Sequence, residues 1–277
     1  MRFLLTGIIV LVLLVKPVVS SDFTNWRQKA QESKNKDEKI RLWTRAIDSW
    51  NYSDGAKGKM EAFYNRGNTY SQKGLYDHAI GDFTRAMEID RNNESLYTIR
   101  GSAYFQKGLY DRAIDDFTKA IEIMPGRAAV HTLRGNVYRY KNDYVHAISD
   151  YNRAIELDPG DAVAYNNRGF AYYYKGYYSR ARNDYDKAIE LNSEYTIAYY
   201  NRGLNHCEEG DYDRAINDLT KAIKLRPEYA DAYYYRGYAY RKKGYYVKAL
   251  QDYTKSIELD PFVSYAILER SIKRIYK

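Results

Sequence analysis

Small and apolar side chains recur along most of this chain with a period of thirty-four residues. The dipeptide Arg-Gly occurs six times at that interval, and its glycine serves as the eighth position of each repeat. The fourth, eighth and eleventh positions are spaced for one helix face, and the twentieth, twenty-fourth and twenty-seventh for a face of a second helix. Each repeat is therefore predicted to be a helix–turn–helix hairpin, and the fold class is predicted to be all-α.

The residue types at these positions are nearly constant. The fourth and eleventh positions are mostly aromatic, the seventeenth is always tyrosine and the twentieth is always alanine. The eighth-position glycines are Gly67, Gly101, Gly135, Gly169, Gly203 and Gly237. A glycine inside a helix costs about 1 kcal/mol relative to alanine, so we expect these glycines to permit close helix approach, with the twentieth-position alanine facing the gap. One hairpin cannot bury its apolar face alone, so neighbouring hairpins must stack.

A second set of residues marks the turn inside each repeat. The fifteenth position holds Gly74, Gly108, Asn142, Gly176, Gly210 and Gly244. Glycine, and after it asparagine, readily adopts the left-handed conformation that ends a helix. The first helix of every repeat is therefore predicted to end at this position.

This pattern resembles the tetratricopeptide repeat (TPR), in an Arg-Gly form of bacterial type. The resemblance covers residues 60–263 as six consecutive repeats, at 60–93, 94–127, 128–161, 162–195, 196–229 and 230–263. The closing proline of the pattern is present in four repeats, whereas Arg91 and Ser193 replace it in the first and the fourth. The resemblance implies a right-handed α-solenoid of hairpins, in which the first helices line a concave groove that binds a protein or peptide.

Both ends of the array depart from the repeat. Residues 22–53 are predicted to form a degenerate N-terminal hairpin, in which Phe23, Trp43 and Ala46 occupy scaffold positions. Residues 54–59 form an insert before the first regular repeat, and residues 264–277 are predicted to be a C-terminal capping helix. Atypical terminal repeats are what a solenoid needs, because its outer faces meet water.

The first twenty residues predict a signal peptide. Arg2 precedes the apolar run "FLLTGIIVLVLLV", and small residues at Val18 and Ser20 suit cleavage after Ser20. The run is shorter than the roughly 20 residues that a membrane-spanning helix needs. We therefore expect an exported protein, periplasmic or secreted. The alternative is an uncleaved membrane anchor formed by residues 3–19, and membrane contact is expected only in that case.

Charge and chemistry narrow the function further. The formal net charge is +8, but acidic and basic residues are interspersed, which indicates solvated helix faces rather than a nucleic-acid-binding stripe. Cys207 is the one cysteine, and the four histidines are not spaced as a metal pair. We therefore expect no catalytic residue, no metal site, no cofactor and no nucleic-acid partner, and the protein is predicted not to be an enzyme.

The seventh and twenty-third positions carry opposite charges in all six repeats. An arginine on an otherwise small or apolar helix face needs a partner, so we hypothesise a ladder of Arg–Asp pairs between helices. The alternative is that both groups face water. The structural pairs are Arg66 and Asp82, Arg100 and Asp116, Arg134 and Asp150, Arg168 and Asp184, Arg202 and Asp218, and Arg236 and Asp252.

The inward-facing positions of the first helices are rich in tyrosine and asparagine. Tyrosine and arginine are favoured at protein interfaces, and asparagine can bond both polar groups of a peptide backbone. The alternative is that these tyrosines only pack against neighbouring helices. The predicted groove residues are Tyr64, Asn65, Asn68, Thr98, Ser102, Asn136, Arg139, Asn166, Asn167, Phe170, Tyr173, Tyr200, Asn201, Leu204, Tyr234, Tyr238 and Arg241.

Two functions remain open at this point. The leading hypothesis is a non-enzymatic exported scaffold that binds a protein or peptide segment in the groove, and the resemblance suggests a role in envelope assembly. The second is a glycan-binding or cell-wall-binding module, because tyrosines can stack on sugar rings and asparagine amides can bond hydroxyl groups.

Overall fold

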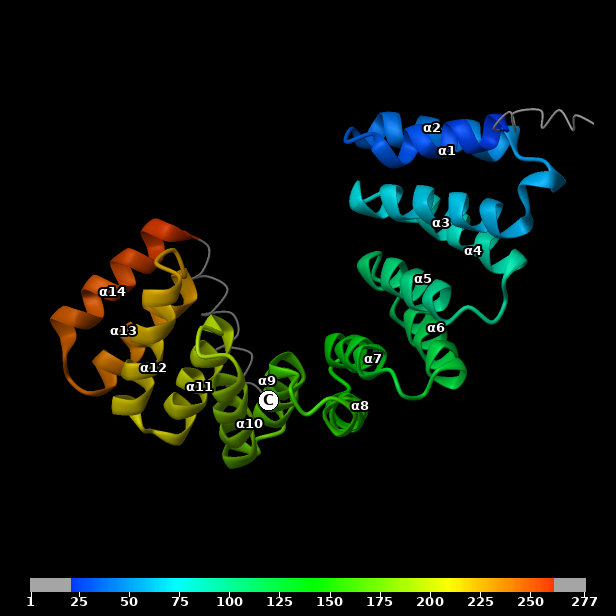
Figure 1. Ribbon diagram of the computed structural model, residues 1–277. Coiled ribbons are helices and arrows are strands. Elements are labelled where there is room, and N and C mark those ends of the chain that lie inside the picture. Colours follow the sequence, from blue (N-terminus) through cyan, green and yellow to red (C-terminus); the bar gives the residue numbers. More distant parts are fainter. Residues whose placement is uncertain (1–20, 262–277) are drawn as a thin grey trace, which may run out of the picture. The chain divides into compact units, whose positions relative to one another are not determined.

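The computed structural model describes residues 21–261 of the chain (Figure 1). Within that range it contains fourteen α-helices, one 3-10 turn and no strand. The predicted all-α fold is therefore confirmed, and the helices follow one another as hairpins. The predicted signal peptide 1–20 and capping helix 264–277 lie outside the described residues.

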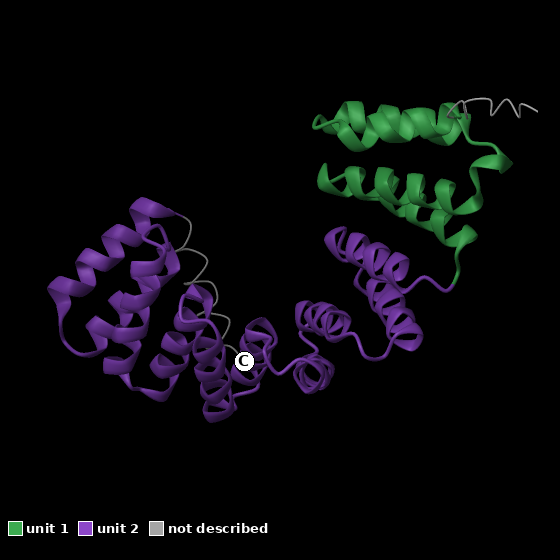
Figure 2. Ribbon diagram, viewed as in Figure 1, with its two compact units in different colours: residues 1–91 green, residues 92–277 purple. Residues whose placement is uncertain are grey.

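The chain divides into two compact units, residues 1–91 and residues 92–277, which are described separately (Figure 2). Unit 1 contains two hairpins joined by a short 3-10 turn. Its elements are α1 (Asp22–Glu32), α2 (Lys36–Ser49), η1 (Tyr52–Asp54), α3 (Ala56–Gln72) and α4 (Tyr76–Ile89).

Unit 2 contains five further hairpins in tandem. Their first helices are α5 (Glu94–Gln106), α7 (Ala128–Tyr140), α9 (Ala162–Tyr174), α11 (Thr196–Glu209) and α13 (Ala230–Lys242). Their second helices are α6 (Tyr110–Ile123), α8 (Tyr144–Leu157), α10 (Tyr178–Leu191), α12 (Tyr212–Leu225) and α14 (Tyr246–Leu259).

Residues 22–49 form the hairpin α1–α2, and most of the residues predicted as an insert belong to the helix that follows. The first hairpin buries Phe23, Trp43 and Ala46 as the pattern predicts. Asp54 ends the 3-10 turn, and the following residues already belong to α3, which begins at Ala56. Most of the predicted 54–59 insert therefore lengthens α3 by about one turn at its N-terminus.

The turn inside each repeat has the predicted left-handed residue. The backbone φ angle is 80° at Gly108 and 60° at Asn142, and the other four fifteenth-position glycines have similar values. After Gly108, the N–H of Leu109 donates to the carbonyl oxygen of Tyr104 at 2.9 Å, which satisfies a carbonyl at the end of α5. The chain can therefore reverse within a few residues and start the second helix.

The eighth-position glycines do allow close approach, but to a different residue than predicted. A Cβ atom on Gly135 would lie 2.8 Å from the ring of Tyr151, at the twenty-fourth position, and one on Gly67 would lie 2.6 Å from the ring of Phe83. The twentieth-position alanines are fully buried nearby. The glycine therefore makes room for the large side chain of the second helix, and at Gly169, Gly203 and Gly237 the backbone oxygen of the alanine is also among the nearest atoms.

Within unit 2, the first helices form one layer and the second helices the other. Each second helix contacts its own first helix, and α6, α8, α10 and α12 also contact the first helix of the next repeat. Consecutive first helices also contact each other, from α5 with α7 through to α11 with α13. The first helices are thus the more closely spaced layer. The face of this layer that points away from the second helices is the candidate groove of this unit.

Candidate functional site

Each seventh-position arginine lies against the aspartate of the second helix of its own repeat. In the hairpin α9–α10, Arg168 donates from Nε and Nη2 to the two carboxylate oxygens of Asp184, at 2.8 and 2.7 Å. The other five predicted pairs have the same two-bond geometry. All six aspartates are buried, so a water-facing arrangement does not describe them.

Several of these arginines also bond to the preceding repeat. Arg168 Nη1 donates to Asn152 at 2.8 Å, and Arg202 Nη1 donates to Asp186 at 2.6 Å. Equivalent acceptors are Thr44 for Arg66, Thr118 for Arg134 and Thr220 for Arg236. One guanidinium therefore links the two helices of its hairpin to each other and to the hairpin before it.

Two aromatic rings flank most of these arginines. The Cζ atom of Arg168 lies 5.5 Å from the ring centre of Tyr165 and 5.9 Å from that of Tyr172. Burial alone would lower the pKa of Arg168, but the hydrogen bonds and charge of Asp184 outweigh it and the pKa is raised. The arginine is permanently charged, and the rings and the carboxylate replace its water.

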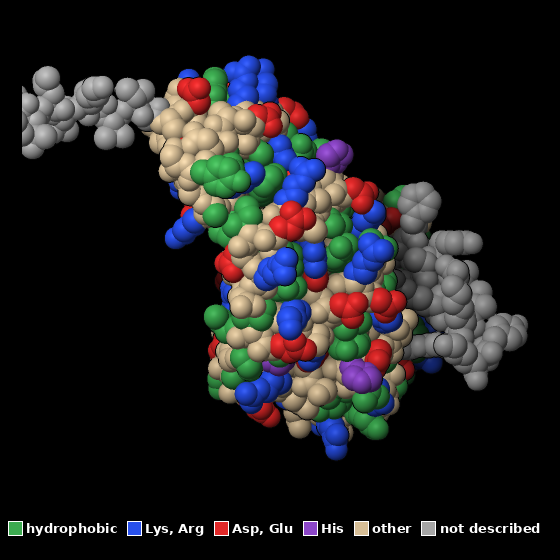
Figure 3. Space-filling view, turned by 90° about the vertical axis from the view of Figure 1, so that its right-hand side faces the viewer, with side chains coloured by type: hydrophobic (Ala, Val, Ile, Leu, Met, Phe, Trp, Pro, Cys, Tyr) green, Lys and Arg blue, Asp and Glu red, His purple; other side chains and the backbone are tan. Residues whose placement is uncertain are grey.

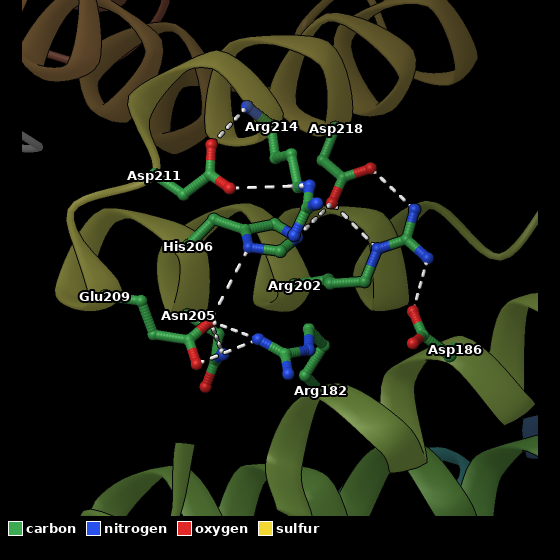
Figure 4. Close-up of polar contacts among 9 residues, drawn as sticks. All are labelled: Arg182, Asp186, Arg202, Asn205, His206, Glu209, Asp211, Arg214 and Asp218. Carbon is green, nitrogen blue, oxygen red and sulfur yellow. Dashed lines mark hydrogen bonds and ion pairs between the residues drawn. The ribbon is translucent and has the colours of Figure 1, made fainter. Parts of the chain in front are cut away.

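In the hairpin α11–α12 a histidine replaces one of the two rings (Figure 4). His206 Nε2 lies 3.7 Å from Asp218, and His206 Nδ1 lies 3.6 Å from Glu209. Glu209 also accepts from Arg182 at 3.0 Å and from Asn205 at 3.2 Å. Burial lowers the pKa of His206, with Asp218 and Asp211 acting in the opposite direction. The imidazole is therefore held neutral beside a charged pair.

Most predicted groove residues are half-buried on the first helices, but three are buried. Tyr64, Asn65 and Asn68 lie on α3 in unit 1, and the others lie on the first helices of unit 2. Asn166, Asn201 and Tyr173 are less than a tenth exposed, so they cannot offer a free surface to a ligand. For these three the prediction of an accessible binding residue is wrong, because their neighbours cover them.

The asparagines of unit 2 bond to one another across consecutive repeats. Asn201 donates to Asn166 at 2.9 Å, Asn166 donates to Asn167 at 3.2 Å, and Asn167 donates to Asn136 at 3.0 Å. Asn136 also accepts from the hydroxyl of the buried Tyr151 at 2.8 Å. This chain of amides runs from α11 through α9 to α7, so much of its bonding capacity is used inside the protein rather than offered to a peptide.

A partly exposed row of aromatic side chains lies near the turns of three repeats, and the sequence analysis did not predict it as a group. We call it the aromatic ridge. Its members are Phe105, Tyr110, Tyr140, Tyr144, Phe170 and Tyr174, and neighbouring rings have centres 4.6 to 6.4 Å apart. The pattern offered one signal that would have revealed it, since tyrosine occupies the thirteenth position in two adjacent repeats.

Arg139 joins the two halves of the aromatic ridge. Its Cζ atom lies 4.8 Å from the ring centre of Tyr140 and 4.9 Å from that of Phe170. Tyr140 and Tyr174 remain 54% and 48% exposed, so half of each ring is available for contact. Exposed tyrosines beside an arginine are the composition found at the centres of protein interfaces.

The predicted tyrosine wall near residues 234–238 packs partly within unit 2. The ring of Tyr234 lies 5.2 Å from that of Tyr253, and the ring of Tyr238 lies 6.4 Å from that of Tyr212. Tyr200 packs on Tyr229, with ring centres 4.8 Å apart. These tyrosines are half-buried, so they combine a packing role with some accessible surface.

The described residues contain little that suggests catalysis. Burial raises the pKa of the Cys207 thiol to about 12, so the thiolate is disfavoured. Residues 21–261 contain no group of three acidic, histidine or cysteine side chains placed to hold a metal ion. Over the same residues, every helix is too short or too polar to cross a bilayer.

Charges of both signs are mixed on the face of the molecule drawn in Figure 3. On this face the lysine and arginine side chains alternate with aspartate and glutamate, and green hydrophobic side chains lie between them. Pairs such as Arg182 with Glu209 and Arg153 with Glu156 show the same mixing at contact distance. Such a surface does not attract a polyanion along a continuous stripe.

Family profiles and solved structures match the chain. A profile described as "Tetratricopeptide repeat" matches residues 61–93, 95–126 and 230–262, and a second with that description matches 162–195. A profile described as "TPR repeat" matches residues 135–176 and 203–244. No curated protein matches the chain.

Among solved structures, MamA is 29% identical, with a TM-score of 0.54 over 58% of this chain and 94% of MamA. YrrB, described as a TPR protein with an unusual peptide-binding site, is 25% identical, with a TM-score of 0.55 over 68% of this chain and 97% of YrrB. A repeat protein from Parabacteroides merdae is 17% identical, with a TM-score of 0.70 over 86% of this chain and 93% of its own. The last likeness concerns the fold alone.

Proposed function

The chain belongs to the tetratricopeptide repeat family, and on that premise we propose that it is an exported scaffold that binds an extended protein segment. Repeats of this family generally serve as non-catalytic scaffolds for protein interaction. We place the binding surface on the first helices of unit 2, with the aromatic ridge as its anchor. The observation that carries the proposal is a pair of half-exposed tyrosines joined through Arg139: the guanidinium lies against Tyr140 and Phe170, and Phe170 packs on Tyr174.

The chemistry of the ridge favours a protein segment with apolar side chains. Tyrosine presents a large rigid area and loses little conformational freedom on binding. Because the asparagine chain already bonds Asn166, Asn167 and Asn201 to one another, the surface has fewer free amides than the sequence suggested. A glycan needs many hydroxyl partners, so the glycan-binding alternative has less support.

A photocrosslinking experiment tests the binding surface. A benzophenone amino acid replaces Tyr174 in one variant and Tyr246, the first residue of α14, in another. Tyr246 is 70% exposed and lies outside the ridge, so it is a matched control. We expect a discrete crosslinked partner from position 174 and its loss when Tyr140→Ala and Phe170→Ala are added. Equal crosslinking from both positions would contradict the proposal.

Export is the second part of the proposal, and it rests on residues 1–20. We expect the mature chain to begin at Ser21, immediately before α1, whose first turn is capped by the side chain of Ser21. N-terminal sequencing of the protein recovered from the cell exterior or envelope fraction tests this. A full-length chain found only in the cytosol would refute export but would leave the binding surface untouched. A role in envelope assembly depends on both parts.

A further inference from the structure

Unit 1 contains a surface pocket that the groove does not include. It has a volume of about 340 Å³ and opens beside the connection between the first two hairpins. Trp50, Tyr52 and Phe63 supply aromatic walls, and Lys59, Arg85 and Glu88 supply charged ones. Ala56 and Ile89 complete the lining. Within residues 21–261 the 3-10 turn beside this pocket occurs once, between α2 and α3.

The two basic side chains of the pocket face rings instead of carboxylates. The Nζ atom of Lys59 lies 4.1 Å from the ring centre of Trp50, and the Cζ atom of Arg85 lies 5.8 Å from that of Phe63. Within residues 21–261 neither cation forms an ion pair, whereas Arg27 and Lys73 in the same unit each have an acidic partner. Both cations are therefore free to accept an anionic group from outside.

The turn that carries Tyr52 and the indole of Trp50 are held by hydrogen bonds within unit 1. Tyr52 is 93% exposed and its ring centre lies 5.4 Å from that of Trp50. The turn that carries Tyr52 is fixed by Asn51 and Asp54, which bond each other's backbone as a capping box. Trp50 Nε1 donates to the carbonyl oxygen of Gly55 at 3.0 Å. A backbone and an indole that are fixed in advance lower the entropy cost of binding at this pocket.

We propose that this pocket binds a protein segment that presents an aromatic side chain beside carboxylates. The aromatic side chain enters between Tyr52, Trp50 and Phe63, and the carboxylates lie against Lys59 and Arg85. The charge of the pocket favours an anionic occupant over a neutral one, because its wall carries two positive groups, Lys59 and Arg85, and one negative group, Glu88. The site is independent of the aromatic ridge, so it gives the scaffold a second point of attachment for a partner.

The test uses the proposed mature chain, from residue 21 onward, and the peptide acetyl-Asp-Phe-Asp-Gly-amide as probe. Binding is followed by the indole NMR signals of the tryptophans, which include Trp50. We expect the Trp50 signal to shift, and Tyr52→Ala to weaken binding about tenfold. Lys59→Gln is expected to weaken it about fivefold, whereas Lys57→Gln, an exposed neighbour outside the pocket, leaves it unchanged. Glu88→Gln is expected to strengthen binding.

Two altered probes separate the contributions of ring and charge. The peptide with Ala in place of Phe, and the peptide with Asn in place of both Asp residues, should each bind at least about fivefold more weakly. Equal binding of all three peptides, or a Trp50 signal that stays fixed at saturating peptide, would overturn the proposal. Binding of chitotetraose in place of the peptide would assign the pocket to a glycan and overturn it as well. Tyr174→Ala should not alter the titration, so failure here and failure of the ridge can be told apart.

Discussion

The hairpins α9–α10 and α11–α12 share one ion-pair geometry but differ in what surrounds it. Both arginines donate twice to their aspartates at 2.7 to 2.8 Å. In the first hairpin Arg168 lies between two tyrosines, and the glycine of α9 faces the ring of Tyr185. In the second, His206 replaces one tyrosine, and the glycine of α11 faces Leu219.

This difference separates what the repeat requires from what it tolerates. The guanidinium, the carboxylate and the small eighth residue are kept in both hairpins. The side chains around the pair differ: a flanking tyrosine is replaced by His206, which can bind a proton, and the large side chain at the twenty-fourth position is Tyr185 in one hairpin and Leu219 in the other. The charged pair therefore fixes the geometry, and the surrounding side chains set how firmly each hairpin holds it and at which pH.

The largest effect is expected from removing one aspartate of the pair. Asp184→Ala and Asp218→Ala each leave a mostly buried guanidinium without its carboxylate, and breaking such a pair costs about 3–5 kcal/mol. Arg202 retains Asp186, half-exposed on the preceding hairpin, as a second partner at 2.6 Å. We therefore expect Asp218→Ala to cost less than Asp184→Ala in urea unfolding.

Asp111→Ala is the control for both substitutions. Asp111 pairs with Lys141 at the surface, and its side chain is 85% exposed. Such a pair contributes about 0–1 kcal/mol. If the control lost as much stability as Asp184→Ala, the buried pairs would have no special role in the repeat.

The next effect concerns the hydrogen bond between the side-chain amides of Asn201 and Asn166, which joins these two hairpins. Asn166→Ala leaves the buried amide of Asn201 without its acceptor, and an unpaired buried polar group costs about 1–3 kcal/mol. Asn201→Ala should cost less, because Asn166 keeps its bond to Asn167. Amide hydrogen exchange can locate the loss, which we expect in α9 and α11. Equal losses from the two substitutions would mean that the chain of amides acts only through packing.

A smaller and asymmetric effect is expected at the eighth-position glycines. An alanine Cβ at Gly169 would lie 2.8 Å from the ring of Tyr185 and 3.1 Å from the backbone oxygen of Ala181. At Gly203 the Cβ would lie 2.8 Å from Cγ of Leu219, but the equivalent backbone oxygen is 3.5 Å away, so the contact with backbone is ordinary. Overpacking costs about 1–3 kcal/mol, offset by about 1 kcal/mol of helix propensity. Thermal melting should therefore show both variants destabilised, with Gly169→Ala losing more than Gly203→Ala.

The smallest effect should appear as a pH dependence confined to the second hairpin. Because burial lowers the pKa of His206 below its ordinary value of 6.5, the unfolded chain binds a proton more readily than the folded one. Stability is then complete above pH 6.5 and falls as the pH drops through the folded pKa. Amide protection in α11 and α12 should decrease over that interval, while α9 and α10 change less. His206→Tyr should abolish the difference, and its persistence in that variant would exclude His206 as the cause.

The sequence predicted the scaffold well and the surface poorly, for a physical reason. A fixed interval reveals which positions must fit between helices, so the glycines, the left-handed turn residues and the Arg–Asp partners could all be named. Which side chains remain free depends on contacts between neighbouring repeats, and period alone does not show that Asn166 and Asn201 bond each other. The aromatic ridge was missed for the same reason, since Tyr140 and Tyr174 gain meaning only when Phe105 and Phe170 lie beside them.

The reach of each arginine has a consequence for how such a chain can change in length. Its carboxylate partner is sixteen residues downstream in the same hairpin, and its other acceptor lies at one fixed site of the previous hairpin, where Thr118, Asn152, Asp186 and Thr220 all serve. Excising thirty-four residues from the middle of unit 2 would therefore bring together a guanidinium and an acceptor that already suit each other. Unequal recombination could therefore remove or add a whole repeat and keep every hydrogen bond at the new junction. The length of the partner segment that the protein can contact would then change by one repeat at a time.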